Sequence, residues 1–195
     1  MTARSVAFPK TLFFSFLNPH PTMSYAWDSE FNALFERCLA RYRSGDTDFE
    51  TYYSEDDLAF LDSIGYRKRE FFDFVEDLAE MGEPSLTTAV MIASVRRDYL
   101  AEIMRGEKST HILDPSTLPA KTSETEGIVW FPRILAKARA KLRGELDPNT
   151  MYCCGGDRAF LKRHDIAPAD FLRAVWAAGD DDQAVLDYVR RNSKA

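Results

Sequence analysis

Residues 133–175 read RILAKARAKLRGELDPNTMYCCGGDRAFLKRHDIAPADFLRAV, and a related stretch stands one hundred positions earlier. Laid over residues 35–75 without a gap, residues 135–175 give nine identities in 41 pairs. The identical pairs are Ala40/Ala140, Arg43/Arg143, Tyr52/Tyr152, Asp57/Asp157, Ala59/Ala159, Phe60/Phe160, Leu61/Leu161, Phe71/Phe171 and Val75/Val175. Self-similarity at a fixed offset indicates that one structural unit is present twice. We therefore expect an all-α protein made of two pseudo-symmetric helical repeats packed on each other.

The helical character of each copy follows from its hydrophobic spacing. Apolar residues recur every three or four positions, and glycines end several of the runs. Ser54-Glu55-Asp56-Asp57 reads as a capping box, in which Ser54 begins a helix and Asp57 reaches back. The helices expected in the first copy are 29–43 with Ser29 as N-cap, 55–64, 67–81 and 86–104. Those expected in the second copy are 132–142, 157–164, 168–178 and 184–191.

The same pattern predicts the domain organisation. The first repeat is expected at residues 23–106 and the second at residues 127–195, and residues 107–126 are rich in Ser, Thr and Pro, as a linker would be. Residues 1–22 contain an apolar run that Pro9 and Lys10 interrupt. Because this run is too short to span a membrane and has no small-residue cleavage site after it, we expect an extension that is poorly ordered.

Composition narrows the class of protein. With 195 residues, 45% of them hydrophobic and 29% charged, the chain is expected to be a globular protein with a sizeable core. A formal net charge of −6 argues against general nucleic-acid binding and against binding to anionic membranes. Three cysteines, two of them adjacent, do not make a disulfide framework, so a cytoplasmic location is expected.

A set of residues in the second repeat carries a family resemblance. They are Gly127-Ile128-Val129-Trp130, Pro132-Arg133, Leu135, Lys137, Arg139, Gly144, Leu146, Gly156-Asp157, Phe160-Leu161, Val175, Gly179, Asp182 and Val185-Leu186. Over about residues 124–190 this pattern resembles a bacterial domain-of-unknown-function family, numbered five-zero-six-nine. The resemblance implies a small helical domain of uncharacterised activity. The family's pattern lacks the adjacent cysteines, so it lends no support to cysteine chemistry.

A basic helix is the first candidate for a binding site. Between Gly127 and Gly144 there are five basic residues and no acidic one. They are Arg133, Lys137, Arg139, Lys141 and Arg143, with Arg133, Lys137 and Lys141 at four-residue spacing. Such a stripe is suited to binding a phosphate-bearing ligand, an RNA segment or an acidic partner. The alternative is a solvated face balanced by the acidic residues 50–62 of the other copy.

The adjacent cysteines are the second candidate. In the superposition Cys154 takes the place of Ser54, so its sulfur is expected at a helix N-terminus, where unpaired amides favour the thiolate. Tyr152 and Asp157 would shape this site. The alternative is that Gly155-Gly156 serves a turn and both Cys153 and Cys154 fill space beneath the tyrosine.

We also considered a metal site made of Cys153, Cys154, Asp157 and His164. Their spacing matches none of the usual zinc-binding patterns. Phosphate-binding loops, dinucleotide-binding glycine patterns and the common hydrolase motifs are missing from the sequence. The sequence therefore predicts no metal and no cofactor.

These observations lead to two functional hypotheses. The first is a non-enzymatic helical binding or adaptor protein that takes an unknown protein or a small anionic ligand in the groove between the repeats. Its binding residues would be Arg133, Lys137, Lys141, Arg143 and Tyr152. The second is a thiol-dependent enzyme or redox sensor in which Cys153 or Cys154 reacts, with Asp157 beside it.

Overall fold

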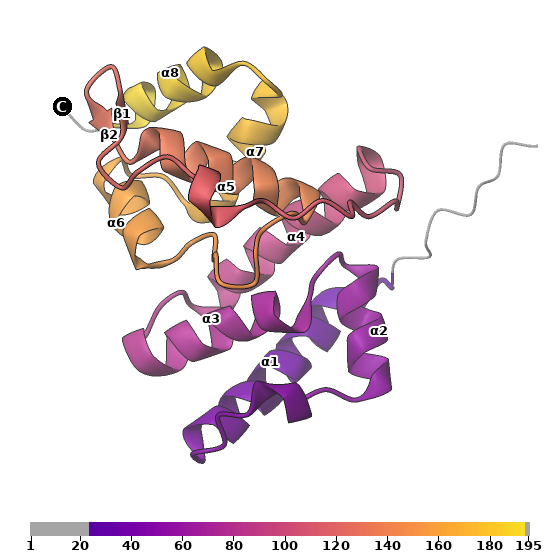
Figure 1. Cartoon of the computed structure of the whole chain (residues 1–195). Helices are drawn as coiled ribbons and strands as arrows, with labels where there is room; N and C mark the ends of the chain where they lie inside the picture. Colours follow the sequence, from indigo (N-terminus) through magenta and orange to yellow (C-terminus); the bar gives the residue numbers. More distant parts are fainter. Residues whose placement is uncertain (1–23, 194–195) are drawn as a thin grey trace, which may run out of the picture.

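The computed structural model describes residues 24–193, and this part of the chain is mostly helical (Figure 1). The expectation of a helical fold is confirmed, with the addition of one short antiparallel hairpin. The helices are α1 (Trp27–Arg43), α2 (Glu55–Ser63), α3 (Lys68–Met81), α4 (Leu86–Glu102), α5 (Phe131–Arg143), α6 (Gly155–Arg163), α7 (Pro168–Ala178) and α8 (Asp182–Asn192). The strands are β1 (Glu124–Thr125) and β2 (Ile128–Val129), and two 3-10 turns lie at Phe49–Thr51 and Pro115–Thr117. The extension expected at residues 1–22 lies outside the described residues.

Helix α4 is the element that both halves of the molecule share. It packs against α1 and α3 of the first half and against α5 and α7 of the second. Figure 1 shows it running between α1–α3, in indigo and magenta, and α5–α8, in orange and yellow. A helix covered on two sides must be apolar around much of its circumference, and α4 buries Ala89, Ile92, Ala93, Val95, Arg96, Leu100 and Ala101.

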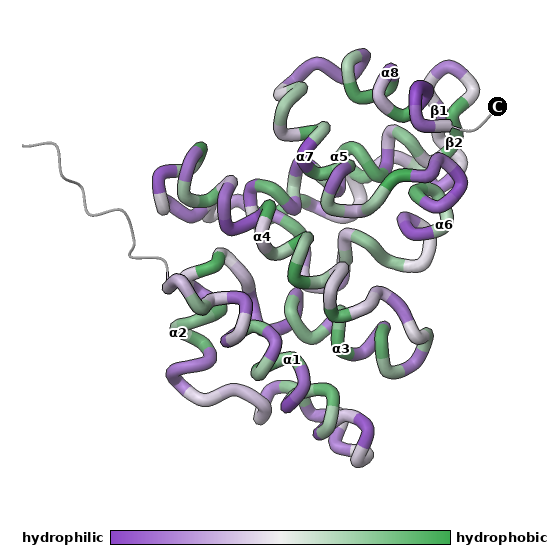
Figure 2. Tube along the Cα trace, turned by 180° about the vertical axis from the view of Figure 1, so that it is seen from behind, coloured by the Kyte–Doolittle hydropathy of each residue, from purple (hydrophilic) through white to green (hydrophobic). Residues whose placement is uncertain are grey.

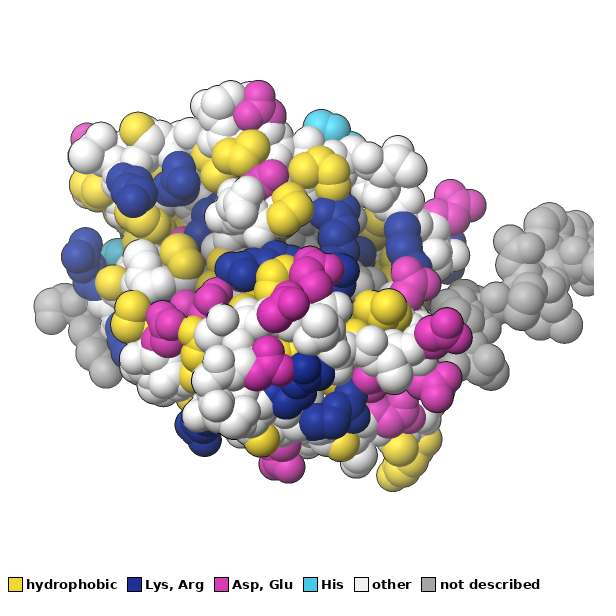
Figure 3. All heavy atoms as spheres, turned by 60° about the horizontal axis from the view of Figure 1, so that its bottom comes forward, with side chains coloured by type: hydrophobic (Ala, Val, Ile, Leu, Met, Phe, Trp, Pro, Cys, Tyr) yellow, Lys and Arg dark blue, Asp and Glu magenta, His cyan; other side chains and the backbone are white. Residues whose placement is uncertain are grey.

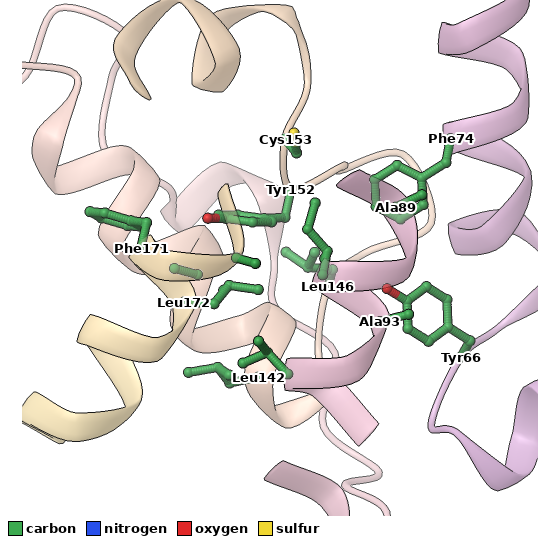
Figure 4. Close-up of a cluster of buried hydrophobic side chains, with 14 of the residues drawn as sticks. Tyr66, Phe74, Ala89, Ala93, Leu142, Leu146, Tyr152, Cys153, Phe171 and Leu172 are labelled. Atoms are coloured by element: carbon green, nitrogen blue, oxygen red, sulfur yellow. The ribbon is translucent and has the colours of Figure 1, made fainter. Parts of the chain in front are cut away.

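One continuous hydrophobic core results from this arrangement. Residues of both halves belong to it, and Figure 4 shows Tyr66 and Phe74 from one half with Leu142 and Phe171 from the other. In Figure 2 hydrophobic and hydrophilic positions alternate along α1, α3 and α5, as expected for amphipathic helices. Each large apolar side chain buried in this way stabilises the fold by about 2 kcal/mol.

The helix bounds of the two halves correspond over part of their length. Helices α2 and α6 both span nine residues and begin one hundred positions apart, and α1 and α5 end at Arg43 and Arg143. The last helices differ, because α4 has 17 residues and α8 has 11. Phe60 is only partly buried, whereas Phe160 is buried beside His164 and Phe171.

Most predicted helix boundaries agree with the structure within three residues. The capping box at Ser54 is confirmed, because its hydroxyl accepts from the amide of Asp57 and the Asp57 carboxylate accepts from the amide of Ser54. The prediction of Ser29 as an N-cap is wrong. Helix α1 begins at Trp27, and Ala26 at its N-cap provides no side-chain hydrogen bond. None of the described helices has the length and apolar character needed to cross a lipid bilayer.

Candidate functional site

A cleft of about 540 Å³ opens between α3 and the N-terminal ends of α5 and α6, and we call it the α3/α5 cleft. Its walls come from α3, from the segment leading into α5 and from the loop before α6. Figure 3 shows Lys and Arg side chains gathered with Asp and Glu along the junction of the two halves. The volume lies within the range of about 300–1,000 Å³ that is usual for small-molecule sites.

A buried carboxylate organises the inner wall of the cleft. Asp157 is completely buried and accepts hydrogen bonds from Nε1 of Trp130 and from the amide of Cys153, each at 2.9 Å. Nζ of Lys137 lies 2.5 Å from Oδ2 of Asp157 and 3.2 Å from Sγ of Cys154. Lys137, Cys154 and Asp157 thus form one contiguous set, which we call the Lys–Asp–Cys cluster. A buried ion pair with further hydrogen bonds is a rigid arrangement, so the position of the ammonium beside the sulfur is fixed.

Cys154 occupies the N-cap of α6, as predicted from its alignment with Ser54. Its side chain makes no capping hydrogen bond, in contrast to Ser54 on α2. Cys154 is partly exposed and lines the α3/α5 cleft, and its thiol contacts the Lys137 ammonium. A thiol placed beside a cation at a helix N-terminus is in the environment where reactive cysteines are found.

Cys153 has different surroundings, although it is the neighbouring residue. Its side chain is completely buried, and it lines a second, smaller pocket together with Pro84, Thr88 and Leu161. Burial raises the pKa of the Cys153 thiol to about 12, with Arg158 opposing the shift and Asp157 adding to it. The two adjacent thiols therefore serve different pockets, and only Cys154 has access to the α3/α5 cleft.

The charges that line the α3/α5 cleft do not cancel. Arg69 pairs with Asp73 and Glu76, at 2.9 and 3.0 Å. The third acidic residue, Asp77, pairs with Arg158 at 2.6 Å, and Lys137 is paired with Asp157.

Two basic residues of the cleft remain without such a partner. Among the described residues, no carboxylate lies within 4.0 Å of the charged nitrogens of Lys121 or Arg133. Arg133 donates to the carbonyl of Pro119 at 2.7 Å, and its guanidinium lies 6.0 Å from the ring centroid of Trp130. With Asp73 ionised, the four basic and three acidic residues that line the cleft give it a formal charge of +1.

Asp73 adds a pH-dependent contribution to this charge. Burial raises the pKa of Asp73 to about 7, while Arg69 opposes the shift and Glu76 and Glu70 add to it. Near neutral pH the carboxyl group is therefore partly protonated. The cleft becomes more negative as the pH rises above 7.

Three of the predicted binding residues lie away from the cleft. Lys141 is buried, pairs with Glu70 at 2.6 Å and lies 3.9 Å from the ring centroid of Tyr66, and burial lowers its pKa. Arg143 pairs with Glu145 at 2.7 Å at the other end of α5. Tyr152 is in the core, where its hydroxyl donates to the carbonyl of Pro168.

The structure thus brings together only some of the predicted site residues. Arg133, Lys137 and Cys154 line the cleft and the buried Asp157 pairs with Lys137, whereas Lys141, Arg143, Tyr152 and Cys153 do not line it. The four-residue spacing of the basic stripe does place its members on one face of α5. Lys141, one turn beyond Lys137, is however buried, and its ammonium pairs with Glu70 of α3.

Sequence reasoning did not single out Lys121, Arg69 or Asp73, which line the cleft from other parts of the chain. The ion pair between Lys137 and Asp157 could have been predicted from the sequence. Arg37 and Asp57, one hundred positions earlier, also form an ion pair, at 2.6 Å. Comparing charges at equivalent positions of the two stretches would have found it.

The glycine pair before Asp157 has a structural explanation. A Cβ on Gly156 would lie 2.5 Å from Cη2 of Trp130 and closer still to Cζ2, so a glycine is required where the indole packs. The nearest heavy atom to a Cβ on Gly155 is 3.8 Å away. Gly156 therefore makes room for Trp130, and it also lines the α3/α5 cleft.

The residues considered for a metal site do not converge. Within residues 24–193 no group of three or more His, Cys, Asp or Glu side chains could hold a metal ion. His164 instead lies 2.6 Å from the hydroxyl of Ser193, measured at Nδ1, and packs against the ring of Phe160.

The C-terminal part of the chain, residues 117–195, matches the family model described as Domain of unknown function (DUF5069). This part is therefore a DUF5069 domain, and the resemblance inferred for about residues 124–190 is confirmed. The matched range contains α5–α8 and one wall of the cleft, while α3 lies outside it. Comparison with curated proteins and with solved structures finds no match.

Proposed function

We propose that this protein binds a small anionic ligand in the α3/α5 cleft and acts as a binding protein, not an enzyme. The observation that carries the proposal is the pair of basic residues, Lys121 and Arg133, that line the cleft without a carboxylate partner among the described residues. A guanidinium and an ammonium that line the same cleft favour phosphate or carboxylate groups. Lys137 lies on the same wall and adds positive potential, although Asp157 neutralises part of it.

Backbone strain at the cleft supports the same proposal. Trp130 and Cys153 adopt positive φ angles of 77° and 72°, which residues other than glycine rarely adopt. Both donate hydrogen bonds to Asp157, so two of the five non-glycine residues with positive φ in the described part of the chain adjoin the Lys–Asp–Cys cluster. Strained residues of this kind cost about 1–3 kcal/mol each and cluster at ligand-binding sites.

Calorimetric titration with inorganic phosphate and with citrate tests the proposal. The variant Lys121→Ala/Arg133→Ala is expected to bind at least tenfold more weakly, because each lost charge-assisted hydrogen bond is worth about 1.5–3 kcal/mol. Arg43→Ala/Arg191→Ala is the matched control, since it removes the same charge from exposed positions on α1 and α8. The proposal fails if neither anion binds, or if both double variants lose the same affinity.

A second candidate function is favoured by the 3.2 Å contact between Nζ of Lys137 and Sγ of Cys154. On this hypothesis Cys154 is the reactive thiol of a thiol-dependent enzyme or redox sensor. Alkylation by iodoacetamide, mapped by peptide mass spectrometry across a pH series, distinguishes it from the first. Reaction of Cys154 well below pH 8 supports the thiol function, and slow labelling of all three cysteines in the folded protein contradicts it.

We also propose that the two halves, about residues 23–106 and 127–195, are copies of one helical unit joined by residues 107–126. The equal bounds of α2 and α6 and the two ion pairs one hundred positions apart support this proposal. The loops that enter these helices have diverged by one position. Tyr53 donates to the carbonyl of Lys68, whereas Tyr152 donates to the equivalent carbonyl of Pro168.

Relatives of the first half provide the test of this duplication. If sequences related to residues 29–105 match the DUF5069 model themselves, the duplication is supported, and a match to a different helical family would contradict it. A reducing, cytoplasmic location remains part of the proposal, because all three cysteines are free. Fractionation of cells that express the chain would test it.

A further inference from the structure

We infer that Cys154 exchanges with the disulfide form of an anionic low-molecular-weight thiol and then holds that thiol in the α3/α5 cleft as a mixed disulfide. The inference rests on the proposed anion binding and names the class of ligand. It is carried by the coincidence, in one cleft, of a partly exposed cysteine with two basic residues that lack carboxylate partners among the described residues.

The sulfur and the charges lie on the same surface. Cys154 is partly exposed and lines the cleft, and its Sγ lies 3.2 Å from the Lys137 ammonium. Lys121 and Arg133 line the same cleft. A ligand that fits this arrangement carries a sulfur close to one or more carboxylates, as peptide thiols do. Exchange proceeds through the Cys154 thiolate.

The exchange step needs no reactant beyond the disulfide itself. The Cys154 thiol gives its proton to solvent, and the resulting thiolate attacks one sulfur of the small disulfide. A bond forms between Sγ of Cys154 and that sulfur while the original sulfur–sulfur bond breaks. The leaving thiolate takes up a proton from solvent. Cys154 is thereby oxidised, and the released thiol is the reduced product.

The neighbouring cysteine does not displace the bound thiol. Cys153 is completely buried and lines the other pocket, so its sulfur does not share the cleft with Cys154. The third cysteine, Cys38, is also completely buried, on α1. The mixed disulfide at Cys154 therefore persists until an external thiol reduces it.

Intact-protein mass spectrometry after timed exposure to three small disulfides tests the inference. Oxidised glutathione carries net negative charge, hydroxyethyl disulfide is neutral, and cystamine carries positive charge. We expect a single adduct, at Cys154 by peptide mapping. At low salt the rate with oxidised glutathione should be about tenfold above the rate with cystamine, because a basic cleft attracts the anionic disulfide and repels the cationic one.

The variants make the result specific. Cys154→Ser should give no adduct. In Lys121→Ala/Arg133→Ala the rates with oxidised glutathione and with cystamine should both move close to the rate with the neutral hydroxyethyl disulfide. Arg43→Ala/Arg191→Ala, with the same change of net charge, should keep the preference for oxidised glutathione. An adduct at Cys38 or Cys153, or equal rates for all three disulfides with the wild-type protein, would overturn the inference.

Phosphate titration of Cys154→Ser separates this inference from the proposed function. If the variant binds phosphate while the wild-type protein shows no charge preference in exchange, the thiol inference fails and anion binding stands. If phosphate does not bind and exchange is also unselective, both fail. If exchange is selective but free phosphate does not bind, the proposed reversible binding of small anions fails while the inference about Cys154 holds.

Discussion

Replacing Lys137 by methionine removes one partner of the buried ion pair in the Lys–Asp–Cys cluster, and the chain provides its own control for this change. Lys137 and Asp157 are 2.5 Å apart, with 3% and 0% of their side chains exposed. Arg37 and Asp57, one hundred positions earlier, are 2.6 Å apart, with 50% and 17% exposed. The two pairs match in distance and differ in their surroundings.

The expected magnitudes follow from that difference. Removing one partner of a buried pair leaves an uncompensated charge in the interior and costs about 3–5 kcal/mol. An exposed pair is screened by water and contributes about 0–1 kcal/mol. Lys137→Met should therefore destabilise the protein by about 3–5 kcal/mol, and Arg37→Met by less than about 1 kcal/mol.

Urea denaturation followed by circular dichroism measures these differences in the free energy of unfolding. Two double-mutant cycles are needed, one with Lys137→Met and Asp157→Asn and one with Arg37→Met and Asp57→Asn. The cycles matter because Asp57 also caps α2 and Asp157 also accepts from Trp130, and such separate losses cancel in the coupling energy.

The coupling energy should be about 2 kcal/mol or more for the buried pair and less than about 1 kcal/mol for the exposed one. Equal coupling energies, within about 0.5 kcal/mol, would refute the reasoning that burial gives the Lys–Asp–Cys cluster its rigidity.

Three further predictions concern residues in the α3/α5 cleft or next to it in the chain. Gly156→Ala should lower the melting temperature, because overpacking against Trp130 costs about 1–3 kcal/mol, whereas Gly155→Ala, with open space around it, should change stability little. The folded pKa of Asp73, about 7, lies above its ordinary value of 3.8, so this group's contribution to stability is fully present below pH 3.8 and is lost as the pH rises through 7. Asp73→Asn should remove that decline between pH 4 and pH 7 in a series of thermal melts, and an unchanged slope would contradict the assignment. Because the pKa of Cys153 is raised to about 12, its alkylation should stay slow up to about pH 10 in the folded protein and become rapid in urea.

The helices could be predicted because their signals are local. Apolar spacing, terminal glycines and the Ser54 capping box depend on residues within one or two turns of each other, and α2 forms as that pattern requires. The alignment at an offset of one hundred carried the cap from Ser54 to Cys154 and was right about its place on α6.

The composition of the cleft could not be predicted in the same way. The basic stripe on α5 is continuous in sequence, but the packing of α3 decides that Lys137 reaches the cleft and Lys141 is enclosed with Glu70. Lys121 enters from a segment with no periodic pattern. The backbone at Cys153, with φ at 72°, turns its thiol away from that of Cys154, and nothing in the residue types reveals that.

The position of α4 has a consequence for any attempt to dissect the chain. The matched DUF5069 range begins at residue 117, after α4 has ended, yet α5 and α7 rest on that helix. A fragment of residues 117–195 would lack α4 and expose the apolar faces of α5 and α7, so it should aggregate or dimerise. A self-sufficient fragment has to begin before Leu86, and the practical boundary of the domain therefore differs from the one that sequence similarity draws.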